Sequence, residues 1–417
     1  MRLWLASAAA AAALISSAAS ADTVCEWMEF SEGVQRAAAP SNPNAPRTPE
    51  HDRVLTQVAL AMFEALDAID HRYESYLKLP QADATASQDA AAATAAYQVL
   101  LAHYPSQKTS LDENYGIALE QVTDLRARES GKAIGQAAAQ AALKAGGIDP
   151  AVKQVPYLPQ TTPGVWVPTQ LPVFEPFSVA FKPWILPNVA AVRPGPPPSL
   201  NSEQWVRDYE EVKRLGARNS TARTPYQTLM ARYRITPNMM PSLRLTADAP
   251  GRLPVQNARM FAMLNMIGDD IGMAMGDAKL HYNFWRPITA IRNGEADGNG
   301  ATAADPSWEP LIQTPNHPEY PCGHCMYAAG TAEFMKAEVG NAPPGGVRVS
   351  SRSIPSSAVQ ALPSWDEWVK QVSFSRTLGG VHYRFSNEVA EDMGRKVAQM
   401  ALANLMKPLP GTAKKKR

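Results

Sequence analysis

Residues 54–76 read VLTQVALAMFEALDAIDHRYESY, and their apolar residues recur with the period of a helix. The spacing of three and four residues places these side chains on one face of an α-helix. We therefore predict an amphipathic helix here, packed against a core. The stripe consists of Val54, Val58, Ala61, Met62, Ala65, Leu66 and Ile69.

The same helical pattern recurs in later parts of the chain. Alanine-rich stretches at 84–102 and 111–145 predict further helices, and Gly146 with Gly147 is a helix stop. Helical patterns return at 202–215, at 257–281 and at 387–406, where Ser386 is the expected N-cap. Residues 150–198 are rich in proline, with Trp166 and Trp184 among them, which predicts an extended strap over the helices. The predicted fold class is all-α, in helical bundles with a Pro-rich strap.

The start of the chain indicates export. Residues 1–21 combine an early Arg2, an apolar run and a small-residue ending, which is typical of a cleaved signal peptide. We therefore expect a periplasmic or secreted protein. No later stretch predicts a membrane span. The formal net charge of +1 gives no reason to expect nucleic acid as a partner.

Cysteine is rare, yet two of the three cysteines form CGHC at Cys322–Cys325. Such a string is found in disulfide isomerases, but Pro321 precedes it and no alternating strand pattern lies upstream, which disfavours a redox dithiol. A zinc site is also disfavoured, because Cys322, His324 and Cys325 lack the usual fourth ligand. Which of the cysteines pair, with Cys25 as the third, stays open.

Three stretches in the second half carry residues suited to an anion. In KLHYNFWRP, Lys279 and Arg286 are seven residues apart and would share a helix face, while Pro287 indicates the helix end. In PCGHC, Gly323 lies where a helix should begin, so backbone N–H groups face an anion there, and His324 beside it could transfer a proton.

The third stretch, SRTLGGVHYRFS, adds a guanidinium fork at Arg376 and a second histidine, His382, after a glycine pair. Taken singly, each stretch also fits a solvated basic face or a structural histidine. Together the three predict a cage of cations for a tetrahedral or trigonal oxyanion, because clustered positive charges repel one another without one.

In this order, K…RP, PxGH and SR…H resemble the signature shared by vanadium-dependent haloperoxidases and type 2 phosphatidic acid phosphatases, and FWRPITAIR and HPEYP are closer to the bacterial haloperoxidase-like branch. The resemblance implies a catalytic helical domain at 251–410 after an N-terminal helical region at 22–250. It also implies vanadate as cofactor, hydrogen peroxide and a halide as substrates, and a possible homo-oligomer. The alternatives are an acid phosphatase that hydrolyses phosphate esters through a phosphohistidine, and a periplasmic oxyanion-binding protein without turnover.

The resemblance also assigns roles. His382 would be the axial metal ligand or phosphatase nucleophile, His324 the acid–base, and His317 and Trp285 would tune halide oxidation, with His317 favouring bromide. The residues that would bind vanadate or phosphate are Lys279, Arg286, Cys322, Gly323, Arg376 and His382.

Two positions depart from the family pattern. Cys322 replaces the usual serine, whose hydroxyl binds the oxyanion, and a thiol is a weaker donor. Ser386 stands four residues after His382, where the family often has aspartate. We therefore expect His382 to be poorly oriented, and Ser386→Asp to tighten vanadate binding.

Overall fold

The first predicted helix is α2 (Pro49–Asp70), and it ends six residues earlier than expected. The backbone N–H groups of Arg72 and Tyr73 bond the carboxylate of Asp67 at 3.0 and 2.9 Å. Glu64 accepts the N–H of Tyr76 in the same way, at 2.7 Å. Carboxylates on the last turns of α2 thus capture the backbone donors that a longer helix would have used.

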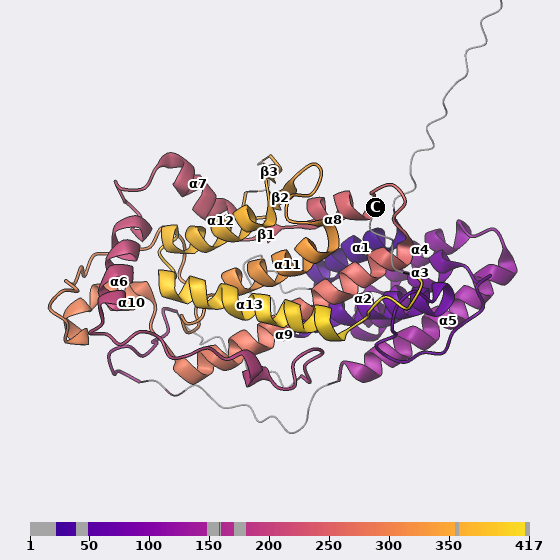
Figure 1. Ribbon diagram of the computed structural model, residues 1–417, viewed down its shortest axis with the longest axis horizontal. Coiled ribbons are helices and arrows are strands. Elements are labelled where there is room, and N and C mark those ends of the chain that lie inside the picture. Colours follow the sequence, from indigo (N-terminus) through magenta and orange to yellow (C-terminus); the bar gives the residue numbers. More distant parts are fainter. Residues whose placement is uncertain are drawn as a thin grey trace, which may run out of the picture.

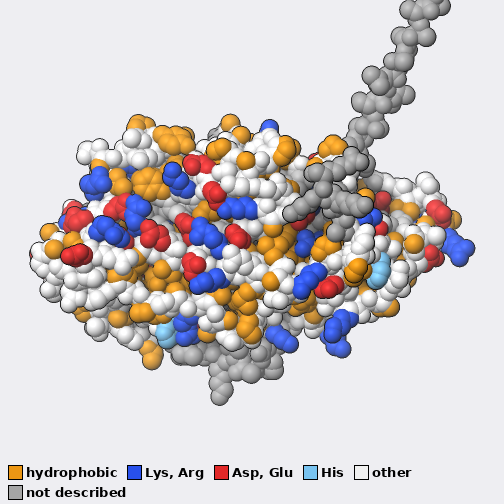
Figure 2. Space-filling model, viewed as in Figure 1, with side chains coloured by type: hydrophobic (Ala, Val, Ile, Leu, Met, Phe, Trp, Pro, Cys, Tyr) orange, Lys and Arg blue, Asp and Glu red, His pale blue; other side chains and the backbone are white. Residues whose placement is uncertain are grey.

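The computed structural model describes residues 22–38, 49–147, 158, 160–170, 181–354 and 358–412. The predicted signal peptide lies outside these ranges, and export stays a prediction. In the described part, every helix is too short or too polar to cross a membrane. Figure 2 shows acidic and basic side chains interspersed over one face of the molecule.

The N-terminal bundle consists of α1 (Thr23–Ala38), α2, α3 (Gln88–His103), α4 (Lys108–Glu120) and α5 (Leu125–Ala145). The single helix expected at 111–145 is two helices, because Asp124 caps α5 by accepting the N–H groups of Arg126 and Ala127. The predicted stop is confirmed, since the Gly146 N–H bonds the carbonyl of Ala142. Alanines of α3 pack against both α2 and α5.

Four further helices form the C-terminal bundle: α9 (Pro254–Tyr282), α11 (Gly323–Val339), α12 (Trp365–Leu378) and α13 (Arg384–Asn404). Helices α11 and α13 approach closely, since a Cβ on Gly394 would lie 2.1 Å from the carbonyl oxygen of Met326. Helix α9 has 29 residues, about 44 Å of helix. It contacts α2 as well as α11 and α13, and so joins the two bundles (Figure 1).

Shorter elements lie between the bundle helices. They are η1 (Pro105–Gln107), η2 (Val189–Val192), α6 (Glu203–Gly216), α7 (Pro225–Tyr233), α8 (Met240–Ala247), α10 (Pro287–Arg292) and η3 (Gly294–Asp297). An antiparallel sheet has the order β1 (Pro237–Asn238), β2 (Val347–Ser351) and β3 (Gln360–Leu362), with Pro237 opposite Ser351 and Val347 opposite Leu362. With three short strands among the described residues, the all-α prediction is confirmed.

The described parts of the strap lie along α9. Near residue 165 the strap exchanges backbone hydrogen bonds with the segment after α9: Trp166 N donates to Asn283 O at 2.8 Å, and Trp285 N donates to Gly164 O at 3.0 Å. Further along, three consecutive N–H groups, those of residues 184–186, donate to the buried carboxylate of Asp270, each at 2.8 Å. The strap is confirmed in these residues, while 150–157 and 171–180 lie outside the described ranges.

Both bundles share one hydrophobic cluster of buried residues, which runs from Val24 in α1 to Met406 after α13. A second, largely aromatic cluster packs α6 against the segments that follow α9 and precede α13. The division of the chain near residue 250 stays a prediction.

Candidate oxyanion site

Lys279 and Arg286 come together, but not through a shared helix as predicted. Helix α9 ends at Tyr282, because Asn283 takes the left-handed conformation at φ 43°. Arg286 lies in extended backbone at φ −79° and ψ 154°, as Pro287 requires. The two cations therefore converge from a helix end and from the loop beyond it.

The ammonium group of Lys279 holds the loop before α11. Its Nζ donates to the carbonyl oxygens of Pro318, Glu319 and Pro321 at 2.8, 2.7 and 2.6 Å. Burial lowers the pKa of this side chain, yet three acceptors need all three hydrogens of an ammonium group. Lys279 thus shapes the site and supplies positive charge from its wall.

Arg286 is fully buried and bonds three elements of the site at once. Its Nε donates to His317 O at 2.9 Å, and its Nη1 donates to Val381 O at 2.8 Å and to Nε2 of His382 at 3.1 Å. Burial lowers the pKa of Arg286 to about 10, so the guanidinium stays charged at neutral pH.

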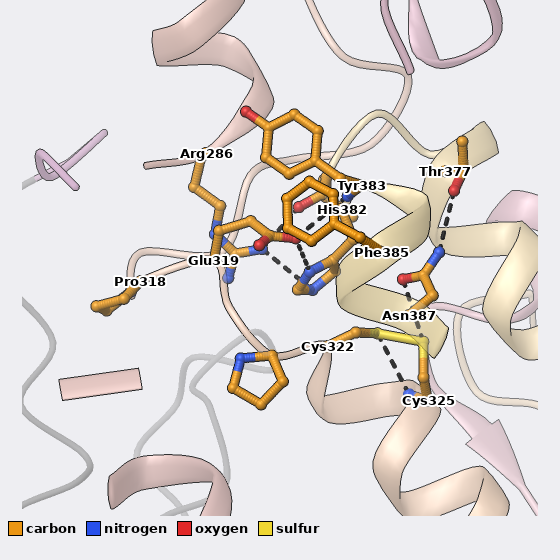
Figure 3. Close-up of polar contacts among 12 residues, drawn as sticks. Arg286, Pro318, Glu319, Cys322, Cys325, Thr377, His382, Tyr383, Phe385 and Asn387 are labelled. Atoms are coloured by element: carbon orange, nitrogen blue, oxygen red, sulfur yellow. Dashed lines mark hydrogen bonds and ion pairs between the residues drawn. A yellow bond between two sulfur atoms is a disulfide. The ribbon is translucent and has the colours of Figure 1, made fainter. Parts of the chain in front are cut away.

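His382 is held on its other side by Glu319, a residue that the sequence analysis did not assign. Nδ1 of His382 lies 2.6 Å from Oε1 of Glu319, which also accepts the N–H of Tyr383 at 3.2 Å (Figure 3). Both side chains are buried. Burial raises the pKa of Glu319 to about 7, against the lowering effect of Arg286 and Lys279.

These contacts fix the tautomer of His382. The carboxylate of Glu319 accepts a hydrogen bond, so Nδ1 carries the proton, and the guanidinium N–H of Arg286 donates to a lone pair on Nε2. The pKa of His382 is lowered by burial and by the cations around it, so the ring is neutral. Nε2 therefore carries the lone pair that a metal or a phosphorus atom would engage.

Arg376, in the last turn of α12, has the donors that a ligand could use. Its side chain is 2% exposed, and its Nε and Nη1 have no hydrogen-bond partner within the described residues. The pKa of Arg376 is lowered to about 9 by burial and by Arg286. No ion pair with a carboxylate of the described part offsets its charge.

The expected helix start at Gly323 is confirmed. Gly323 is the first residue of α11, and N–H groups in a first turn have no carbonyl partner within the helix. A Cβ at this position would lie 2.4 Å from Sδ of Met275, so the absence of a side chain allows the close packing observed.

His324 follows, with its Nε2 at 2.9 Å from the carbonyl oxygen of Ile235. Since only an N–H can bond a carbonyl, Nδ1 is the ring atom that can accept a proton. Burial and then Arg376 lower the pKa of His324 to about 3, so this ring is also neutral. It is a base placed beside cations.

Cys322 and Cys325 form a disulfide at the start of α11. Cys322 is the N-cap, and its Sγ accepts the N–H of Cys325 at 3.3 Å. Sγ of Cys325 lies 3.3 Å from Oδ1 of Asn387 on α13. The open question of pairing is thereby answered: Cys25 is the free thiol, and Cys322 has no S–H to donate to an oxyanion.

The residues proposed to tune halide oxidation flank the site. Nδ1 of His317 lies 2.9 Å from Nη2 of Arg286. Trp285 is buried and stacks on Trp205 with ring centroids 5.9 Å apart, in the aromatic cluster behind Arg286. Their roles in halide choice stay predictions.

Ser386 is not the N-cap of α13 as predicted. The helix starts at Arg384 after Tyr383, and Ser386 is fully buried in the first turn. Its hydroxyl is among the groups that lower the pKa of Glu319, so it lies beside that carboxylate. The expectation that no carboxylate stands against His382 is wrong, because Oε1 of Glu319 lies 2.6 Å from its Nδ1.

The residues present fit an oxyanion such as vanadate or phosphate. Lys279, Arg286 and Arg376 place three buried cations around neutral His382, against the carboxylate of Glu319. The unpartnered donors of Arg376 give a ligand its hydrogen bonds, and Nε2 of His382 gives it a lone pair. Elsewhere in the described residues, no group of three or more His, Cys, Asp or Glu side chains could hold a metal ion.

Residues 259–411 match the family described as the VCPO second helical-bundle domain. This match contains the whole set of cations and histidines described above. The C-terminal part of this chain is therefore similar to the second helical bundle of vanadium chloroperoxidases. The resemblance noted in the sequence is thereby confirmed.

Individual vanadium haloperoxidases show how far the likeness extends. A vanadium chloroperoxidase of Curvularia inaequalis is 25% identical over 177 residues, which cover 34% of this chain and 28% of that enzyme. This chain thus matches less than a third of that enzyme's length.

Two solved structures share the fold over most of the chain. The first bacterial vanadium-dependent iodoperoxidase superposes with a TM-score of 0.76 at 19% identity, over 92% of this chain and 96% of that one. The holo-type bacterial vanadium-dependent chloroperoxidase gives 0.66 at 18% identity, over 88% and 94%. The vanadium haloperoxidase fold therefore includes the N-terminal bundle.

Proposed function

We propose that this protein is a vanadate-dependent haloperoxidase, which oxidises a halide with hydrogen peroxide. The observation that carries the proposal is the buried guanidinium of Arg376, whose Nε and Nη1 have no hydrogen-bond partner among the described residues. Arg376 is also one of the cations whose charge acts on His382. Each hydrogen bond from a charged donor contributes about 1.5–3 kcal/mol, so an oxyanion bound there would be held firmly.

Vanadate, when bound, would act as a Lewis acid towards peroxide. Nε2 of His382 would bind it, in place of the contact between that atom and Arg286. Arg286 and Arg376 would donate to its oxygens, and the N–H of Gly323 would donate from the start of α11. Lys279 would add charge while it holds the loop.

His324 is proposed as the acid–base. Its ring is neutral and its Nδ1 can accept a proton from hydrogen peroxide, since Nε2 is engaged with Ile235. Bromide is the proposed halide, on the strength of His317 at the position that tunes halide oxidation in the family. Export is proposed from residues 1–21.

The experiment is bromination of a phenol-type dye by vanadate-loaded protein with hydrogen peroxide, compared for chloride, bromide and iodide. His382→Ala should abolish activity and vanadate binding together. His324→Ala should retain vanadate yet slow turnover by about 10²- to 10⁴-fold, the usual contribution of a positioned acid–base.

Excess phosphate should inhibit by occupying the same cations. If the loaded protein halogenates nothing but the vanadate-free protein hydrolyses phosphate esters, the site is that of a phosphatase. Binding of vanadate with neither activity would indicate an oxyanion-binding protein.

A further inference from the structure

We propose that Glu319 is the residue that positions His382, and that Ser386 is small and uncharged because Glu319 occupies the place of a carboxylate there. The orienting carboxylate would thus come from the loop before α11 and not from α13. The identity of the ligand rests on the proposed function, whereas the positioning of the ring does not.

Glu319 is itself held at both ends. Its backbone oxygen accepts a hydrogen bond from Nζ of Lys279 at 2.7 Å. Its Oε1 bonds Nδ1 of His382 at 2.6 Å and the N–H of Tyr383 at 3.2 Å. A buried carboxylate with both its backbone and its side chain fixed sets the plane and the tautomer of the imidazole it contacts.

The contact at the other ring nitrogen supports the same tautomer. Nη1 of Arg286 lies 3.1 Å from Nε2 of His382 and donates to Val381 O at 2.8 Å. An arginine has no acceptor, so Nε2 must present a lone pair. Arg286 can donate to the lone pair on Nε2 only while the ring proton stays on Nδ1, where Glu319 accepts its hydrogen bond.

Ser386 completes the arrangement. It is fully buried in the first turn of α13, and its carbonyl oxygen accepts the N–H of Cys322 at 3.3 Å. Cys322 follows Glu319 by three residues, so this contact places Ser386 against the loop that carries Glu319. An aspartate there would bring a second carboxylate close to Glu319 at a buried place, where two like charges cannot both stay ionised without cost. An orienting carboxylate is therefore favourable at position 319 or at position 386, but not at both.

The test compares the natural protein with three variants: Glu319→Gln, Ser386→Asp and the double variant that carries both changes. Titration calorimetry measures the Kd of inorganic phosphate and of vanadate. Nitrogen-15 NMR of the histidine rings in the anion-free protein reports the tautomer of His382, which a merely structural role of Glu319 would not change.

Glu319→Gln should weaken binding of both anions about 10- to 100-fold, the usual effect of removing such a partner, and shift His382 towards a mixture of tautomers. Ser386→Asp alone should bind no more tightly than the natural protein. The double variant should recover at least tenfold of the lost affinity, because the carboxylate returns on α13.

Asp208→Asn is the matched control. Asp208, in α6, is also a buried carboxylate, and it accepts the N–H of Phe385 in the first turn of α13 at 2.9 Å. Its loss should lower the melting temperature without altering the His382 tautomer. If Glu319→Gln does not fold, Glu319→Asp, which shortens the side chain by one methylene, should shift the tautomer in the same direction.

The proposal is overturned if Glu319→Gln binds both anions within threefold of the natural protein and leaves the ring signals unchanged. A double variant no tighter than Glu319→Gln would overturn the part that concerns Ser386. Should neither anion bind the natural protein, the proposed function fails, while the NMR comparison still decides the role of Glu319.

Discussion

At the scale of single residues, the disulfide changes what Cys322 can do. As a free thiol it would be a weak donor open to oxidation by peroxide, and as half of a disulfide it is neither. Its remaining part in the site is to cap α11 through Sγ. The oxyanion must then rely on Arg376, Arg286 and the backbone for its hydrogen bonds.

Cys325→Ser should leave a free thiol at Cys322, whereas Cys322→Ser combined with Cys325→Ala should leave a hydroxyl cap and no thiol at the site. We expect both variants to bind phosphate initially. After treatment with hydrogen peroxide, the single variant should lose affinity as its thiol is oxidised, and the double variant should not. Calorimetry before and after peroxide measures this, and equal behaviour of the two variants would contradict it.

Arg376 supplies the clearest test of the cage. Arg376→Ala should weaken phosphate and vanadate binding by about 10- to 150-fold, which corresponds to one or more charge-assisted hydrogen bonds of about 1.5–3 kcal/mol. Arg376→Lys should bind with intermediate affinity, because it keeps the charge but lacks the planar fork. Arg395→Ala, on the outer side of α13, is the control and should bind normally. Full affinity in Arg376→Ala would rule out the cage.

At the scale of elements, helix period predicted where helices lie but not where they stop. The end of α2 depends on Asp67 and the start of α5 on Asp124, because their side chains accept nearby N–H groups. Such competition by a short polar side chain leaves little trace in a hydrophobic pattern. The stop at Gly146 and the extended backbone that Pro287 imposes on Arg286 were predicted correctly, whereas α9 ends earlier than Pro287 indicated, at Tyr282.

The strap depends on Asp270 in α9. Asp270→Ala removes the acceptor of three buried N–H groups, so it should cost about 3 kcal/mol or more in the free energy of unfolding. Asp277→Ala, which breaks the partly exposed pair with Arg193 on the same helix, should cost about 1 kcal/mol or less. Urea denaturation compares the two variants. Equal losses would mean that the strap contributes little through Asp270.

At the scale of the whole molecule, the site joins residues that are far apart in the chain. The order of the three motifs predicted Lys279, Arg286, Gly323, Arg376 and His382 together. Glu319 could not be found in that way, because its contact with His382 spans 63 positions and follows from how the loop before α11 turns back. Its position within HPEYP was the one available hint.

The excess of buried positive charge predicts that anions stabilise the fold. A ligand at 100 times its Kd adds about 2.7 kcal/mol to the free energy of unfolding, so phosphate or vanadate should raise the melting temperature by a few degrees. Chloride at equal ionic strength is the control for screening. Arg376→Ala should show a much smaller rise, and an undiminished rise would place the stabilising anion elsewhere.

Helix α9 should make the two bundles unfold together on heating. Helix α9 packs against α2 of one bundle and against α11 and α13 of the other. Unfolding of either bundle would therefore expose part of the buried surface of α9 to water. Calorimetry should therefore record a single endotherm, with equal calorimetric and van't Hoff enthalpies, whereas two bundles that unfolded independently would give two transitions. Function and cooperativity would then be lost at the same temperature, and activity would report the folded state of the whole chain.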